Sequence, residues 1–130
     1  MSHELKILAQ YRLEKALENI SDAQNNFNND RIAVSVNRSY YAIFHAIRAV
    51  LALDKFDSKR HSSIIGYFNK HYLATGIIDK RYSLIVTSAF KLRNSSDYDD
   101  FYKASREEAA TQLKNAGEFV QMIQERVLPD

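Results

Sequence analysis

A chain of 130 residues with 45% hydrophobic residues can fill the core of one ordinary domain, so residues 1–130 are expected to form a single domain. Three Gly and one Pro are too few for the turns of a strand-rich fold, and the lack of Cys excludes disulfides and Cys-based zinc sites. No apolar run reaches transmembrane length and the charged N-terminus is no signal peptide, so we expect a cytoplasmic protein that does not enter membranes.

The net charge of +2 is unevenly distributed. Residues 31–82 hold nine Lys or Arg against three Asp, whereas the rest holds nine against thirteen Asp or Glu. A basic middle with acidic flanks can attract a polyanion, can pair two copies of the chain, or can be a solvated surface without a partner.

The first expected helix covers about residues 3–27, followed by a polar break in which Asn29 or Asp30 can cap the next helix. The second expected helix covers about residues 30–53 and is apolar on more than one face, which is typical of a central or interface helix. The apolar positions of the first helix are Leu5, Leu8, Leu13, Ala16, Ile20, Ala23 and Phe27.

A third helix is expected after the charged connection 54–60, with Asp57 or Ser58 as its cap and Gly76 just past its end. Its apolar positions are Ile64, Ile65, Phe68 and Tyr72.

A fourth helix should begin after a cap at Asp79 and fray near Asp97, because residues 94–96 are weak helix formers. The residues from Ser105 to Glu108 fit a capping box for a fifth helix, and Pro129 comes just past its end. We therefore predict an all-α, up-down antiparallel bundle of about five helices.

Sequence motifs for metals and phosphate loops are absent. No two histidines have the i, i+4 spacing of helical metal ligands, and there is no Gly-rich phosphate loop. We expect no metal and no cofactor, and any phosphate must be bound by Arg, Lys and helix ends.

The second helix carries a polar stripe at steps of three and four residues, formed by Asn37, Arg38, Tyr41, His45 and Arg48. A buried arginine is costly unless it is paired. Arg38 can pair with an acid of the first helix, for which the candidates are Glu14, Glu18 and Asp22. Alternatively, the stripe is an anion-binding groove in which Arg38, Tyr41 and Arg48 contact phosphate oxygens.

The end of the fourth helix carries Lys91, Arg93, Asp97 and Tyr98. Arg93 and Asp97 have i, i+4 spacing and can form a surface ion pair. Alternatively, Arg93 points into a shared cleft, where Asp97 or Tyr98 orients it and Lys91 adds positive charge.

Three segments resemble the HEPN superfamily, and are most similar to its small bacterial and archaeal branch: NRSYYAIFHAIRAVL, FNKHYLATGIIDK and FKLRNSSDYDDFY. The resemblance covers about residues 5 to 127. It implies an up-down bundle with a short fifth helix, and a homodimer that brings two copies of the fourth-helix motif together. It also implies a toxin–antitoxin pair, in which the HEPN protein is a ribonuclease and a minimal nucleotidyltransferase neutralises it.

The ribonuclease motif of the family is Arg, then four to six residues, then His. Arg93 matches the arginine, but Tyr98, Asp99 and Asp100 stand where the histidine is expected. Metal-independent RNA cleavage needs a base, an acid and positive charge on the phosphorane. Arg93 can supply the charge and His45 the imidazole, with Asp97 and Tyr98 as weaker candidates for proton transfer.

Two main hypotheses follow. The first is an RNA-directed toxin, a metal-independent endoribonuclease weakened by the missing histidine. The second is a non-catalytic HEPN module that binds a nucleotide or a partner protein through Arg38 and Arg93. A purely structural dimer is the third alternative.

Some family toxins are silenced by AMP transfer to a tyrosine two residues past the motif histidine. The aligned residue here is Asp100, and the neighbouring candidates for modification are Tyr98 and Tyr102.

Overall fold

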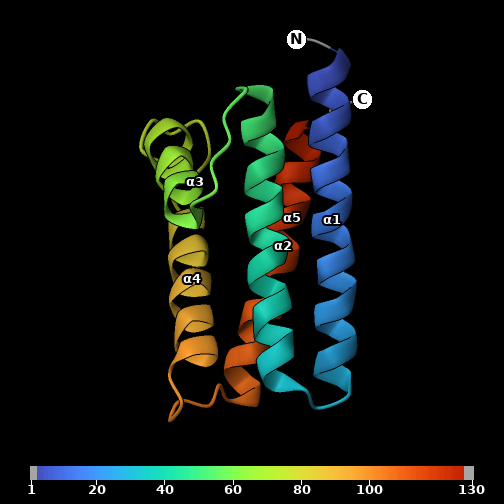
Figure 1. Cartoon of the computed structure of the whole chain (residues 1–130), viewed down its shortest axis with the longest axis vertical. Coiled ribbons are helices and arrows are strands. Elements are labelled where there is room, and N and C mark those ends of the chain that lie inside the picture. The colour runs from blue at the N-terminus through green and yellow to red at the C-terminus, as the bar shows by residue number, and fades with distance from the viewer. Residues whose placement is uncertain (1–2, 128–130) are drawn as a thin grey trace.

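The computed structural model describes residues 3–127, and within that range the chain is helical with no strand. The prediction of an all-α bundle is confirmed. Helices α1 and α4 run in one direction along the bundle and α2, α3 and α5 in the other, with α1, α2 and α5 side by side and α3 and α4 across α2 from α1 (Figure 1). The elements are α1 (His3–Asn28), α2 (Ile32–Leu53), α3 (His61–Phe68), its π-helical continuation η1 (Asn69–Leu73), α4 (Tyr82–Tyr98) and α5 (Arg106–Val127).

Helix α2 is the centre of the fold, as its apolar pattern predicts. It packs against α1, α3, α4 and α5, and it buries residues on more than one face. Alanines of α1 that are fully buried, Ala9, Ala16 and Ala23, allow α1 to lie close to α2. Each fully buried large side chain of the core contributes about 1.5–3 kcal/mol. Those with at most 2% exposure include Leu13, Ile43, Ile47, Phe68 and Phe119.

The predicted cap of α2 is wrong. Asp30 adopts a left-handed φ of 64° and ends α1 instead, because the Arg31 amide donates to the Asn26 carbonyl and the Asp30 amide donates to the Phe27 carbonyl. Arg31 precedes α2 without a side-chain cap. The Asp30 carboxylate is 2.6 Å from Arg106 at the start of α5.

The predicted cap of α3 is also wrong. Arg60 precedes α3 and no side chain caps it, while the carboxylate of Asp57 is bound by two arginines. The Ser58 hydroxyl accepts a hydrogen bond from the Arg60 amide at 3.2 Å within the connection. The carboxylate of Asp57 therefore forms ion pairs with two guanidiniums and does not cap α3.

Other predicted helix ends are present. The Ser105 hydroxyl accepts from the Glu108 amide at 3.0 Å, and Glu108 accepts from the Ser105 amide at 2.9 Å, which confirms the capping box. Gly76 has a φ of 79° after η1, as expected for a helix-ending glycine. By contrast, Asp79 is not the cap of α4, because Arg81 precedes α4 without a side-chain cap; the Asp79 carboxylate accepts a hydrogen bond from the Arg81 amide in the preceding turn. Pro129 lies outside the described residues.

Within residues 3–127, no helix has both the length and the apolar character needed to cross a bilayer. The same part of the chain contains no group of three or more His, Asp or Glu side chains arranged to hold a metal ion.

Candidate functional site

Arg93 lies near the end of α4, and its guanidinium is held by two helices. Its Nη2 donates to the hydroxyl of Tyr41 on α2 at 3.1 Å, and its Nε donates to Asp97 Oδ2 at 3.1 Å. Its Nη1 makes a longer contact of 3.4 Å with Asn94 Oδ1. Because only 12% of the side chain is exposed, protein groups have replaced most of the water around this charge.

Three tyrosine rings surround the Arg93 guanidinium. Its central carbon lies 4.9 Å from the ring centroid of Tyr40, 5.5 Å from that of Tyr41 and 5.3 Å from that of Tyr98. A guanidinium near aromatic faces is attracted to their negative charge density, by about 0.5–2 kcal/mol per contact. The rings therefore stabilise the charged guanidinium in this position.

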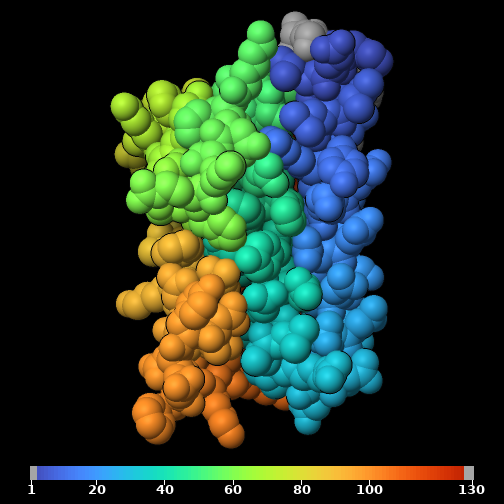
Figure 2. Space-filling view, viewed as in Figure 1, coloured from blue at the N-terminus to red at the C-terminus, as the bar shows by residue number. Residues whose placement is uncertain are grey.

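Asp97 connects Arg93 to α2. It forms the predicted i, i+4 ion pair with Arg93, and the same carboxylate oxygen accepts from Asn37 Nδ2 at 3.0 Å. Since Asn37 belongs to the polar stripe of α2, the stripe and the end of α4 meet at one place. Figure 2 shows this surface of α2 between α1 on one side and α3 and α4 on the other.

The imidazole associated with this cluster belongs to His61, which sequence reasoning missed. His61 is the first residue of α3, and its Nδ1 lies 2.9 Å from the hydroxyl of Tyr40, whose ring is beside Arg93. Its ring stacks on Phe44 at a centroid distance of 4.1 Å. Burial, together with the charges of Arg93 and Arg48, lowers the pKa of His61.

His61 was not predicted because the position of the start of α3 depends on the conformation of the connection 54–60. The sequence of that connection has no periodic pattern from which its conformation could be predicted. A usable signal was the buried Tyr40 in the second helix, because a buried phenol requires a hydrogen-bonding partner. A histidine at the start of the next helix is such a partner.

His45, the imidazole nominated from the sequence, contacts the rings of Tyr41 and Phe44. Within residues 3–127, no hydrogen bond or ring contact joins it to Arg93. Its Nδ1 is buried without a hydrogen-bonding partner. Burial, followed by the charges of Arg48 and Lys15, lowers the pKa of His45 to about 4, so the ring is neutral at pH 7.

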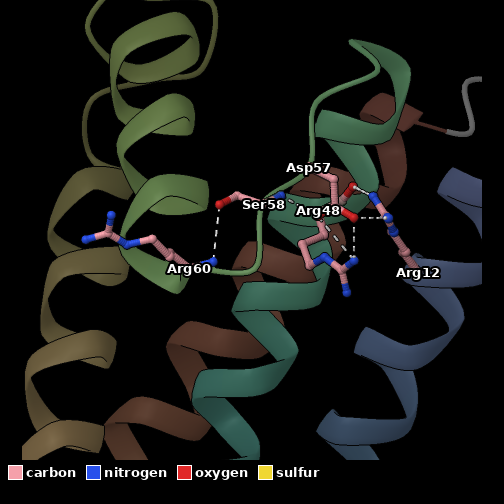
Figure 3. Close-up of polar contacts among 5 residues, drawn as sticks. All are labelled: Arg12, Arg48, Asp57, Ser58 and Arg60. Carbon is pink, nitrogen blue, oxygen red and sulfur yellow. Dashed lines mark hydrogen bonds and ion pairs between the residues drawn. The ribbon is translucent and has the colours of Figure 1, made fainter.

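Arg48 takes part in a different cluster, with Arg12 and Asp57, which we call the Asp57 cluster (Figure 3). Asp57 Oδ2 lies 3.1 Å from both guanidiniums, and Arg12 Nη1 also donates to the Arg48 carbonyl at 3.1 Å. Arg12 is 8% exposed, and burial lowers its pKa. The hydrogen bonds from Arg48 and the Ser58 amide lower the pKa of Asp57 despite partial desolvation.

The remaining anion-binding candidates are Arg38 and Lys91. Arg38 is half-buried, and no hydrogen bond or ion pair within residues 3–127 joins it to Glu14, Glu18 or Asp22. Lys91 lines a pocket of about 500 Å³ together with residues of α4 and α5. The members of that pocket are Ser88, Lys91, Leu92, Ser95, Tyr102, Ser105, Glu107, Glu108, Thr111 and Gln112.

The two candidate tyrosines for modification differ in accessibility. Tyr98 is 71% exposed at the end of α4. The hydroxyl of Tyr102 donates to Glu108 Oε2 at 2.7 Å, and this hydrogen bond raises the pKa of Tyr102.

A second pocket, of about 510 Å³, lies beside His61 and is lined by Phe44, Arg48, Asp57, Ser58, Lys59 and His61. It adjoins the Asp57 cluster on one side and the imidazole on the other. The Asp57 carboxylate in this lining is paired with Arg48, while Lys59 and the imidazole of His61 are the further groups that suit a phosphate-containing ligand.

Comparison with known proteins identifies the family of the chain. Residues 9–127 match the HEPN domain family. The chain is 35% identical over 111 residues to "Putative toxin MJ0605" of Methanocaldococcus jannaschii, covering 85% of this chain and 82% of that protein. It is 27% identical over 127 residues to a UPF0332 protein of Thermotoga maritima, covering 98% and 96% of the two chains. With a UPF0332 protein of Archaeoglobus fulgidus it shares 33% identity over 116 residues, 89% of this chain and 92% of that one. The chain therefore belongs to the HEPN family.

Proposed function

We propose that the protein is a HEPN toxin that cleaves RNA without a metal ion, with Arg93 stabilising the charge that develops at the scissile phosphate. The observation that carries the proposal is the fixed position of the Arg93 guanidinium, which is held by Tyr41 and Asp97 and lies over the ring of Tyr40, the hydrogen-bonding partner of an imidazole. The name of the relative from Methanocaldococcus jannaschii supports the toxin assignment.

The proposed reaction is a transesterification within the RNA. The 2′-oxygen attacks the adjacent phosphorus and loses its proton, the bond from phosphorus to the 5′-oxygen breaks, and the 5′-oxygen takes up a proton. The products are a 2′,3′-cyclic phosphate and a 5′-hydroxyl. A fixed guanidinium lowers the barrier because negative charge accumulates on the phosphorane oxygens, and one such donor is typically worth about 10²–10³-fold in rate.

The test combines growth and cleavage. Expression of the wild type should slow growth, and Arg93→Ala should restore it. Purified wild-type protein should cut tRNA or mRNA in the presence of EDTA and leave 2′,3′-cyclic phosphate ends. A wild type that neither slows growth nor cuts RNA would contradict the proposal.

We also propose that the toxin is a homodimer neutralised by a minimal nucleotidyltransferase. If that partner transfers AMP to this chain, Tyr98 is the expected acceptor, because its ring is exposed beside Arg93 while the Tyr102 hydroxyl is engaged by Glu108. Co-expression followed by mass spectrometry should find the added mass on Tyr98 and none in Tyr98→Phe. Modification of Tyr102 instead would contradict the assignment.

A specific observation also favours a non-catalytic alternative. Each nitrogen of the Arg93 guanidinium has a protein partner, whereas Arg38 has no hydrogen bond or ion pair within residues 3–127. A module that binds a nucleotide through Arg38 would show no RNA cleavage. Nucleotides should then raise the Tm of the wild type, and Arg38→Ala should abolish that shift.

A further inference from the structure

We propose that His61 is the general base of this site, in place of the histidine that the end of α4 lacks. The inference rests on the proposed RNA-cleaving function. In that reaction, His61 at the start of α3 accepts the proton, and Arg93 near the end of α4 stabilises the charge of the phosphorane. The two side chains meet at Tyr40, whose hydroxyl is 2.9 Å from His61 Nδ1 and whose ring centroid is 4.9 Å from the Arg93 guanidinium carbon.

The ring of His61 is held in one orientation. Phe44 stacks on it at 4.1 Å with an interplanar angle of 25°, and the Tyr41 ring meets it edge-on at 5.8 Å. Tyr40 is 2% exposed, so its hydroxyl is a fixed partner for Nδ1 and not a mobile surface group. Burial is the main cause that raises the pKa of Tyr40, and the phenol therefore stays protonated at neutral pH.

This arrangement leaves one ring nitrogen for the substrate. When Nδ1–H donates to the Tyr40 oxygen, the lone pair of Nε2 is free to accept a proton, as in sites where a second group fixes the tautomer of a catalytic histidine. The neutral form predominates at pH 7 because the surroundings lower the pKa of His61. In the tautomer that carries its proton on Nδ1, His61 can act as a base without prior deprotonation.

Space for a substrate is present next to the ring. His61 lines the pocket of about 510 Å³, in which Arg48 and the exposed Lys59 provide positive charge. Phosphates on either side of the scissile one would be attracted to these cations. By contrast, Nδ1 of His45 is buried, and that ring is not among the lining residues of the pocket.

In the proposed step, protons are transferred as one bond to phosphorus forms and another breaks. Nε2 of His61 takes the proton of the 2′-hydroxyl while the bond between the 2′-oxygen and phosphorus forms. The bond to the 5′-oxygen breaks, that oxygen takes a proton from water, and the imidazolium releases its proton to solvent.

The charged and titratable groups that surround His61 come from three parts of the chain. Burial, followed by the charges of Arg93 and Arg48, lowers the pKa of the imidazole, and all of the surrounding groups remain in a His61 variant. They are Tyr40, Tyr41 and Arg48 of α2, Asp57 and Lys59 of the connection, and Arg93 of α4.

The test measures cleavage of a short fluorescent RNA by the full-length protein and its variants. His61→Gln should lower kcat/KM by about 10²–10⁴-fold, the usual contribution of a general base. His71→Gln, which alters an exposed histidine on η1, is the matched control and should retain the wild-type rate. His61→Ala with added imidazole should recover part of the lost activity, which a purely structural role would not allow.

The pH profile of the wild type provides a measurement that does not depend on any variant. Its kcat/KM should rise with pH through a midpoint below pH 6.5, because the pKa of His61 is lowered from its ordinary value of 6.5, and the residual activity of His61→Gln should lack that rise. Wild-type cleavage that survives in His61→Gln but disappears in His45→Gln would overturn the inference and leave the proposed function intact. A wild type that cuts no RNA would overturn both.

Discussion

Two arginine–carboxylate clusters border α2, and they differ in what surrounds the guanidinium. In the Asp57 cluster, one carboxylate is shared by Arg12 and Arg48, and a backbone carbonyl takes up a further donor. Around Arg93, one guanidinium meets one carboxylate, one phenol and three aromatic rings, close to a neutral imidazole. The first arrangement joins chain segments, while the second places a fixed cation beside a group that can accept a proton.

The comparison predicts separate consequences for stability and activity. The Asp57 cluster links α1, α2 and the connection to α3, and it contains an arginine that is only 8% exposed. Removing its carboxylate should mainly affect folding. The Arg93 cluster lies at the end of α4, where changes should mainly affect the reaction.

The largest expected effect on stability is that of Asp57→Ala. It leaves Arg12 without its carboxylate partner in a poorly hydrated place, and breaking such a pair typically costs about 3–5 kcal/mol, here reduced to about 3 kcal/mol because Asp57 is half exposed. Urea denaturation measures the change. The control is Asp30→Ala, which breaks an exposed pair with Arg106 and should cost about 0–1 kcal/mol. Equal losses of unfolding free energy in the two variants would show that the Asp57 cluster stabilises the fold no more than an exposed ion pair does.

The next effect is on the reaction. Arg93→Lys keeps the charge but cannot reach both Asp97 and Tyr41, so we expect RNA cleavage to fall by about 10²-fold, equal to about 2.7 kcal/mol of barrier. The free energy of unfolding should change by about 1 kcal/mol or less. Lys91→Ala, on the pocket between α4 and α5, is the control and should cleave at the wild-type rate. A loss of activity in Lys91→Ala as large as that in Arg93→Lys would contradict a specific role of the Arg93 guanidinium in cleavage.

These expectations also indicate which parts of the molecule the sequence could predict. The five helices were predictable because hydrophobic periodicity and the Ser105–Glu108 capping box are local signals. The ion pair between Arg93 and Asp97 was predictable because residues four apart are neighbours on a helix surface. The resemblance to the HEPN family made Arg93 a candidate site residue. The periodicity, the capping box and the i, i+4 spacing all concern residues within one helix or at its end.

The remaining features depend on contacts between distant segments. Asp57 was expected to cap a helix, but Arg12, forty-five residues earlier, binds it instead. His61 lies beside Tyr40 only because the connection after α2 folds back along that helix. His45 is on the predicted stripe, yet the stripe alone could not indicate that Nδ1 would be buried without a partner.

A smaller effect concerns His45, which lies between the two clusters and is influenced by Arg48 and Arg12. Its pKa is about 4 in the folded protein and 6.5 in the reference state, so the unfolded chain binds more protons between these values. The contribution to stability is therefore complete above pH 6.5 and is lost as the pH falls toward 4. Urea midpoints at pH 7.5 and pH 5 should differ more for the wild type than for His45→Gln. An unchanged pH dependence in the variant would contradict the burial of a neutral His45.

The smallest expected effect is that of Asn37→Ala, which removes the hydrogen bond that ties Asp97 to α2. A partly exposed hydrogen bond of this kind contributes about 0.5–1.5 kcal/mol. The Tm should fall slightly, and Gln24→Ala, which removes an exposed contact on α1, is the control. If the two changes have the same effect, Asn37 does not help to position the Arg93 cluster.

The most direct test of the central claim is RNA cleavage by wild type, Arg93→Ala and Asp57→Ala, measured at a temperature where circular dichroism shows all three to be folded. The account predicts that Arg93→Ala is folded and loses about 10²-fold or more in rate, while Asp57→Ala is less stable and retains most of its activity per folded molecule. Wild-type cleavage in Arg93→Ala, or equal losses in both variants, would contradict the assignment of the reaction to the Arg93 cluster.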